Sequence, residues 1–295
     1  MTKPSSTLGN QNNFGGLPEK FSNERDAGIV ILPVPYDGTS TWIKGSDKGP
    51  GAILEASSNM ELYDIETGTE VYRRGIFTAA PITERSSPEK MVGAVAERVR
   101  YFLDTGKFPV VIGGEHSVSI GSIQAFASHY PELSVLQLDA HSDLRNEYEG
   151  SENNHACVMA RAKEVASIVQ VGVRSADSGE LPATDMKRVF FAHQIYGSDN
   201  WMDQAVGLLS DNVYITIDLD VFDPAIMPST GTPEPGGMGW YQSLRLIEKV
   251  IAARKLVGFD VVELCPSESN KAPDFLAAKL IYRILSMKFC KQEPA

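Results

Sequence analysis

Histidine and aspartate residues follow directly after three short apolar segments of the sequence. The motifs are Gly-Gly-Glu-His at positions 113–116, Asp-Ala-His-Ser-Asp at 139–143 and Asp-Leu-Asp at 218–220. If the apolar segments are strands of one parallel sheet, their carboxyl ends lie along a common edge and bring these side chains together. Alternate residues of an extended chain point the same way, so Asp139 and His141 converge, as do Asp218 and Asp220.

Such a cluster has a specific electrostatic requirement. Asp139, Asp143, Asp218 and Asp220 would repel one another and stay partly protonated unless cations neutralise them. Carboxylate and imidazole ligands without thiolate favour Mn²⁺, Fe²⁺, Ni²⁺ or Zn²⁺. An isolated Asp-x-Asp is usually a loop or a helix cap, but three motifs at strand ends of one sheet favour a binuclear metal site. Such a site makes a nucleophile from water at neutral pH.

Eight short, mostly apolar segments are predicted to be strands. Several, such as the Ile-Val-Ile-Leu run that begins at Ile29, are apolar at every position, which is typical of strands covered on both faces. The predicted strands span residues 28–34, 75–79, 108–112, 134–138, 167–171, 188–192, 213–217 and 256–262.

Helical segments alternate with these strands. Ser87, Pro88 and Glu89 are typical of a helix start, an apolar stripe follows, and Gly106 ends the segment. Further helices are predicted at 241–254 and from about Pro273 onward. The alternation predicts an α/β protein with a single open, mostly parallel sheet between layers of helices.

Length and composition favour an ordinary enzyme. We expect an N-terminal arm at 1–24, followed by a single domain at 25–295. With 27 basic and 38 acidic residues, the net charge of −11 disfavours a nucleic-acid or anionic-membrane partner and favours cationic ligands. Three scattered cysteines and the absence of a signal-like or membrane-spanning apolar stretch predict a cytoplasmic protein with reduced thiols.

The motifs resemble those of the ureohydrolases, the arginase and agmatinase family. Besides positions 113–116, 139–143 and 217–224, the likeness includes Gly-Thr-Pro-Glu-Pro-Gly-Gly at 231–237 and Asp-Val-Val-Glu-Leu-Cys-Pro at 260–266. It extends from about residue 34 to residue 285. The resemblance implies a three-layer α/β/α fold with an eight-stranded parallel sheet, a binuclear manganese centre, and assembly into trimers or hexamers. It also implies hydrolysis of a guanidino group to urea and an amine.

The resemblance further implies a role for individual residues. Glu263 would bind the guanidinium, Asp143 would hold the nucleophile and relay its proton, and His155 would shuttle that proton to the departing amine, which needs a general acid. Without the resemblance, His155 would be interpreted as a surface histidine. The implied metal ligands are His116, Asp139, His141, Asp143, Asp218 and Asp220.

Substrate choice is expected to depend on the segments after Asp143 and Val173. The Arg-Asn-Glu-Tyr-Glu stretch at 145–149 looks like the agmatinase branch, and the acids Glu147, Glu149 and Glu152 favour a dicationic substrate such as agmatine, which yields putrescine. Asp177 matches a family position near the far end of the substrate. Arg145 either pairs with Glu147 or Glu149 or binds a carboxylate of the substrate. The second option points to guanidinobutyrase, guanidinopropionase or formiminoglutamase activity.

Two other hypotheses remain open from the sequence. Binuclear metallophosphatases also use Asp-x-His, but in a different motif order and with a Gly-Asn-His motif that this chain lacks. A non-catalytic ureohydrolase homologue is disfavoured because all of the implied site residues are present.

Overall fold

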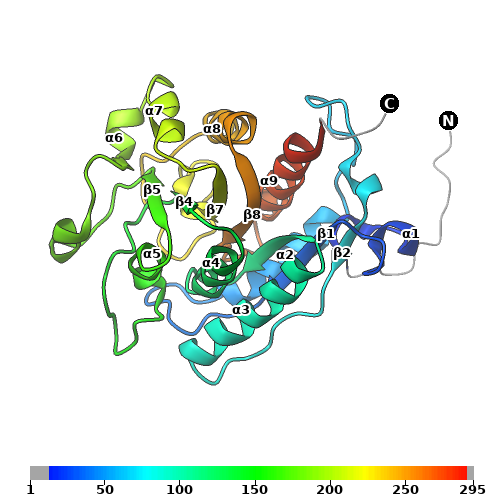
Figure 1. Cartoon of the computed structure of the whole chain (residues 1–295), viewed down its shortest axis with the longest axis horizontal. Helices are drawn as coiled ribbons and strands as arrows, with labels where there is room; N and C mark the ends of the chain where they lie inside the picture. Colours follow the sequence, from blue (N-terminus) through cyan, green and yellow to red (C-terminus); the bar gives the residue numbers. More distant parts are fainter. Residues whose placement is uncertain (1–12, 291–295) are drawn as a thin grey trace.

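Eight parallel strands form one sheet at the centre of the molecule (Figure 1). The computed structural model describes residues 13–290. The strand order is β2-β1-β3-β8-β7-β4-β5-β6, and every neighbouring pair is parallel. The strands are β1 (Ile29–Val34), β2 (Ile76–Thr78), β3 (Phe108–Gly113), β4 (Leu133–Leu138), β5 (Ser167–Val171), β6 (Val189–Phe190), β7 (Asn212–Asp218) and β8 (Lys255–Val262). All eight predicted strands are confirmed, with ends that differ by at most two residues.

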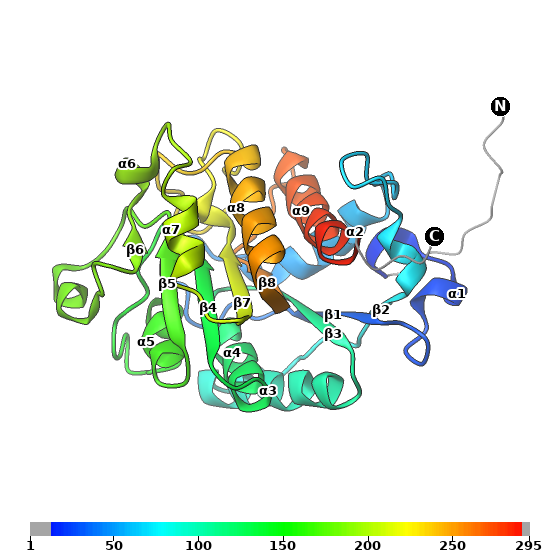
Figure 2. The ribbon, with the colours of Figure 1, turned by 45° about the horizontal axis from the view of Figure 1, so that its top comes forward.

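Helices cover both faces of the sheet, as Figure 2 shows. One layer contains α2 (Gly49–Ser57), α7 (Met202–Gly207), α8 (Trp240–Ala253) and α9 (Ala272–Phe289), and the other contains α3 (Pro88–Asp104), α4 (Val118–His129) and α5 (Val158–Lys163). The remaining helices are the short α1 (Glu19–Ser22) and α6 (Ala192–Ile195), with the 3-10 turns Phe14–Gly16, Ser46–Lys48, Val71–Arg74, His155–Cys157, Ser178–Ala183 and Leu219–Val221. The predicted three-layer α/β/α fold is confirmed.

The two layers enclose separate apolar cores. Ile31 of β1 packs into the core under α8 and α9, whereas its neighbour Val30 packs into the core under α3 and α4. Side chains that alternate along a strand therefore reach opposite cores, and both are buried. This explains why the strands are apolar at consecutive positions.

The predicted helix boundaries follow local capping chemistry. The Ser87 hydroxyl accepts a hydrogen bond from the Lys90 backbone N–H at 3.3 Å, and Pro88 takes the first helical position, where no N–H is needed. Gly106 adopts a φ of 74° just beyond the last turn, a conformation that costs glycine little. Helices α8 and α9 begin within a residue of their predicted starts.

The terminal segments are described only in part. Residues 1–12 of the predicted arm and 291–295 of the predicted domain lie outside the described residues. Phe14 and Leu17, in the described part of the arm, are buried in the core beneath α2 and α9. The boundary at residue 24 stays a prediction. None of the described helices combines the length and apolar character needed to cross a bilayer.

The sheet order decides which loops meet at its carboxyl edge. Strand β8 lies between β3 and β7, and β7 lies beside β4. The four strands that precede the predicted metal ligands and Glu263 are therefore neighbours in the sheet, although they are dispersed along the chain, and β5, which precedes Asp177, lies next to β4. In open α/β sheets, ligands bind at this edge.

Candidate metal centre

A close backbone crossing places the first histidine. A side chain on Gly114 would put its Cβ 1.9 Å from the carbonyl oxygen of Tyr36, so only glycine fits where the loop after β3 passes the end of β1. The Gly114 N–H donates to the Val34 carbonyl at 2.9 Å, which fixes this crossing. His116 follows, and its backbone N–H donates to Glu263 Oε1 at 2.7 Å.

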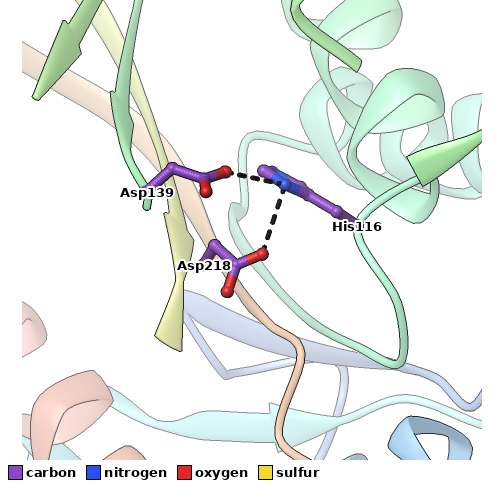
Figure 3. Close-up of side chains that lie close together, drawn as sticks. All are labelled: His116, Asp139 and Asp218. Atoms are coloured by element: carbon purple, nitrogen blue, oxygen red, sulfur yellow. Dashed lines mark ion pairs between the residues drawn. The ribbon is translucent and has the colours of Figure 1, made fainter. Parts of the chain in front are cut away.

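His116, Asp139 and Asp218 form a first cluster of ligand atoms. Figure 3 shows both carboxylates directed toward the imidazole of His116. The His116 Nδ1 atom lies 3.1 Å from Asp139 Oδ2, 3.5 Å from Asp218 Oδ2 and 2.9 Å from Asp143 Oδ2. All four side chains are buried.

Asp139, His141 and Asp220 form a second cluster beside the first. His141 Nδ1 lies 2.9 Å from Asp220 Oδ2 and 3.7 Å from Asp139 Oδ1. Asp139 therefore turns one carboxylate oxygen toward each histidine. This arrangement has the geometry of a ligand shared by two neighbouring cations.

Hydrogen bonds orient His116 so that Nδ1 faces the aspartates. Its Nε2 lies 2.9 Å from the Thr216 hydroxyl, which itself donates to Asp260 Oδ1 at 2.7 Å. Because that hydroxyl proton is used, Nε2–H is the donor to Thr216. Nδ1 is buried and makes no hydrogen bond within residues 13–290, although three carboxylate oxygens lie within 3.5 Å. A buried nitrogen facing carboxylate oxygens fits a divalent cation and its outer hydrogen-bond partners.

The carboxylates lack basic partners other than histidine. Among the described residues, only histidines form ion pairs with the three aspartates of the clusters and with the adjacent Asp143. Burial and the charge of Asp220 raise the pKa of Asp218 well above its usual value, and burial and the charge of Asp139 raise the pKa of Asp143 to about 7. Burial opposes the charged form of His116, but Asp139 and Asp143 raise its pKa well above the usual value. Without cations, protons therefore neutralise part of the negative charge of the clusters.

Two acidic residues of the cavity, Asp143 and Glu263, adopt left-handed backbone conformations. Asp143 has a φ of 51° and Glu263 a φ of 66°, which are unfavourable for residues with a Cβ. Backbone hydrogen bonds hold both: the Asp143 carbonyl accepts from Met159 N–H at 2.9 Å, and Glu263 N–H donates to the Gly114 carbonyl at 2.7 Å. Burial and the neighbouring Glu115 raise the pKa of Glu263 well above its usual value.

A cavity of about 330 Å³ opens onto both clusters. Every predicted site residue except the fully buried Asp139 lines this cavity, including His155, Arg145, Asp177 and Glu263. Burial, followed by positive charge on His116 and His141, lowers the pKa of His155 to about 4. The structure therefore brings His155, Glu263 and the two clusters into one cavity.

Arg145 contacts a residue that the sequence did not suggest as its partner. Its guanidinium lies 3.9 Å from Asp177 and 4.3 Å from the ring centre of Tyr148, rather than pairing with Glu147 or Glu149. Those two acids are exposed and do not line the cavity.

Glu152 is also engaged elsewhere, since it pairs with Arg161 at 3.0 Å. The expectation that these three loop acids favour a dicationic substrate is therefore not supported by their positions.

Sequence analysis missed several residues of the cavity. The buried Glu180 accepts hydrogen bonds from Leu144 N–H at 2.9 Å and from Asp177 N–H at 2.6 Å, so it joins the two loops. The Asp-x-x-Glu spacing of a capping box at 177–180 was a usable signal for it. Trp42 and Ile43 also line the cavity, and no pattern in the sequence points to them.

Comparisons with known proteins agree with this geometry. The model described as the arginase family matches residues 27–286. An N(1)-aminopropylagmatine ureohydrolase of Synechocystis sp. is 36% identical over 291 residues, covering 93% of this chain and 95% of that protein. An agmatinase of Pyrococcus horikoshii is 32% identical over 273 residues, covering 89% and 93%. The crystal structure of agmatine ureohydrolase of Thermoplasma volcanium has a TM-score of 0.82 at 32% identity, covering 91% and 93%.

Replacement of one proposed histidine ligand is expected to reduce the metal content of the protein by one cation per chain. We predict that His141→Ala retains no more than one tightly bound Mn²⁺ per chain after dialysis, whereas the unaltered protein retains two. Loss of an outer partner alone costs about 10–100-fold in metal affinity, and loss of a ligand costs at least as much. Elemental analysis measures the content. His129→Ala, on a histidine paired with Asp104 outside the cavity, is the control. Two ions retained by His141→Ala would contradict the assignment.

Metal affinity is expected to fall as the pH is lowered. Below about pH 7, Asp143 holds a proton that an arriving cation must displace, and the raised pKa values of Asp218 and His116 add to this competition. Calorimetric Mn²⁺ titrations at pH 6, 7 and 8 should show proton release and about tenfold weaker binding per pH unit for each proton displaced. Affinity independent of pH would count against buried, protonated ligands.

Proposed function

The chain belongs to the arginase family, and we propose that it hydrolyses agmatine to putrescine and urea. The proposal rests on acidic groups in one cavity: Glu263 lies beside the clusters, and Asp177 lines the same space. Agmatine carries a guanidinium at one end, an ammonium at the other and no carboxylate, so carboxylates suit both of its ends. Family membership also excludes the metallophosphatase alternative.

The five side chains of the two clusters, together with Asp143, are proposed to hold two divalent cations, Mn²⁺ in the native enzyme. When bound, the pair supplies a nucleophilic water at neutral pH. Asp139, with one oxygen toward each histidine, would contribute to holding both cations. The proposed ligands are His116, Asp139, His141, Asp143, Asp218 and Asp220.

Three side chains, Glu263, Asp143 and His155, have complementary roles in this proposal. Glu263 accepts charge-assisted hydrogen bonds from the guanidinium N–H groups and so positions the central carbon. Asp143 would accept the proton that the nucleophile releases and relay it toward the departing nitrogen. His155, with a pKa of about 4, is neutral at pH 7 and passes a proton on to the departing amine without storing it.

A longer substrate is the second candidate. Several relatives with 36% identity are named N(1)-aminopropylagmatine ureohydrolases. Trp42, which is 69% exposed, and Ile43 line the cavity and present apolar surface to a longer methylene chain. This observation favours N(1)-aminopropylagmatine over arginine, which is shorter and carries a carboxylate.

The guanidino acids are the alternative substrates that Arg145 would serve. Arg145 is the cavity residue suited to a carboxylate, but its guanidinium faces Asp177 and the ring of Tyr148. An acid substrate would have to compete with Asp177 for Arg145, just as the ammonium of agmatine would compete with Arg145 for Asp177. The cytoplasmic location and the trimeric or hexameric assembly remain predictions.

A panel of guanidino compounds tests the proposal. We expect the Mn²⁺-loaded enzyme to release urea from agmatine or N(1)-aminopropylagmatine with a kcat/KM at least about tenfold above that for arginine or 4-guanidinobutyrate, because one ion pair to the distal ammonium contributes about 1.4 kcal/mol. Asp177→Asn should raise KM for the preferred amine about tenfold.

Asp185→Asn is the matched control, since Asp185 is exposed and lies outside the cavity. Within residues 13–290 its carboxylate contacts Arg188 at 3.8 Å and the Lys187 backbone N–H at 3.0 Å. A preference for 4-guanidinobutyrate would overturn the agmatine assignment. Full Mn²⁺ occupancy with no urea from any compound would favour the non-catalytic homologue.

A further inference from the structure

The ring of His155 is held by a residue from a distant segment. Thr39 lies on the loop between β1 and the turn at Ser46–Lys48, 116 residues from His155. Its hydroxyl oxygen accepts a hydrogen bond from the His155 backbone N–H at 3.0 Å and lies 3.2 Å from His155 Nδ1. One hydroxyl thus fixes both the backbone and the ring of the same residue.

The Thr39 hydroxyl is itself buried between two functional loops. It is 7% exposed, and a hydrogen bond from it opposes the effect of burial on the pKa of Glu115, the residue that precedes His116. A threonine hydroxyl has one donor and two acceptor positions, and these contacts use all of them. Thr39 therefore joins the loop after β3 to the loop that carries His155.

The loop that carries Thr39 is closed on itself. The Asp37 carboxylate accepts a hydrogen bond from Gly45 N–H at 2.6 Å and another from the Ser40 hydroxyl, and Lys44 lies 3.3 Å away. These bonds fix the turn between residues 37 and 45. The position of Thr39 is thus set before any substrate enters the cavity.

Only one ring nitrogen of His155 remains for the substrate. Nδ1 faces Thr39, and Tyr148 packs edge-on against the ring with centroids 6.0 Å apart and an interplanar angle of 82°. Nε2 has no hydrogen-bond partner among residues 13–290, and His155 lines the cavity. A half-turn of the ring would exchange Nδ1 for a carbon at Thr39 and remove Nε2 from its place.

We propose that Thr39 is a positioning residue for the hydrolysis, whose hydroxyl holds the His155 ring with Nε2 available to the leaving amine. This inference rests on the proposed function, in which His155 delivers the proton. Because Nδ1–H donates to the Thr39 hydroxyl, Nε2 is the nitrogen that takes up the proton relayed by Asp143 and releases it to the leaving amine. This transfer requires Nε2 within hydrogen-bond reach of both groups, so a ring free to turn delivers the proton less often. Thr39 touches neither substrate nor cation in this account.

Thr39→Val tests the proposal because valine keeps the shape and removes the hydroxyl. With the preferred guanidino substrate, we expect kcat to fall at least about tenfold, KM to change less than about threefold, and Mn²⁺ content to stay at two. Thr39→Ser, which keeps the hydroxyl, should restore most of kcat. Thr69→Val removes a buried threonine hydroxyl outside the cavity and should leave kcat unchanged. An unchanged kcat in Thr39→Val, or a fall that Thr39→Ser does not reverse, overturns the proposal.

A measurement without turnover separates this inference from the proposed function. In ¹⁵N spectra of metal-free protein labelled at histidine, with His155 assigned through His155→Gln, the unaltered protein and Thr39→Ser should show one fixed tautomer. Thr39→Val should show averaged ring nitrogens. Identical His155 signals in all three proteins overturn the positioning role, even if no guanidino compound is hydrolysed. If Thr39→Val does not fold, a mobile ring in Thr39→Ser overturns it equally.

Discussion

Electrostatic repulsion among buried carboxylates is the constraint on which the rest of this structure depends. Asp139, Asp143, Asp218 and Asp220 are buried, and within the described residues only histidines pair with them. Burial of uncompensated charge is unfavourable. It therefore raises the pKa values of Asp143 and Asp218, so that these carboxylates keep their protons to higher pH. Two divalent cations, with four positive charges, would neutralise the four carboxylates. The left-handed backbone of Asp143 and the oriented imidazole of His116 are then features of a preformed site.

The order of the strands brings these acidic side chains to adjoining positions at the carboxyl edge of the sheet. Because β8 lies between β3 and β7, Glu263 at its end projects between the loop that carries His116 and the strand that carries Asp218. The Glu263 carboxylate accepts a hydrogen bond from the His116 backbone N–H at 2.7 Å, so this bond joins the proposed substrate-binding acid to a proposed metal ligand. A different strand order with the same loops would separate them.

The sequence predicted the elements that depend on periodic or local patterns. The strands were recognisable because both of their faces are buried, and the clusters were predictable because alternate residues at adjoining strand ends converge. Contacts between loops were not predictable in this way. Thr39 meets His155 across 116 residues, and Arg145 faces Asp177 instead of its neighbours in sequence. Such contacts depend on how irregular segments pack, which leaves no periodic pattern in the sequence. For the same reason the sequence could not show that Glu147 is exposed and lies outside the cavity.

Anomalous diffraction from crystals equilibrated with Mn²⁺ tests the central claim most directly. Two peaks should appear at the carboxyl edge of the sheet, about 3.5–4 Å apart. We expect one beside His116 Nδ1, the other beside His141 Nδ1, and Asp139 between them. A single peak, or strong peaks away from these side chains at saturating Mn²⁺, would contradict the claim that two cations neutralise this cluster.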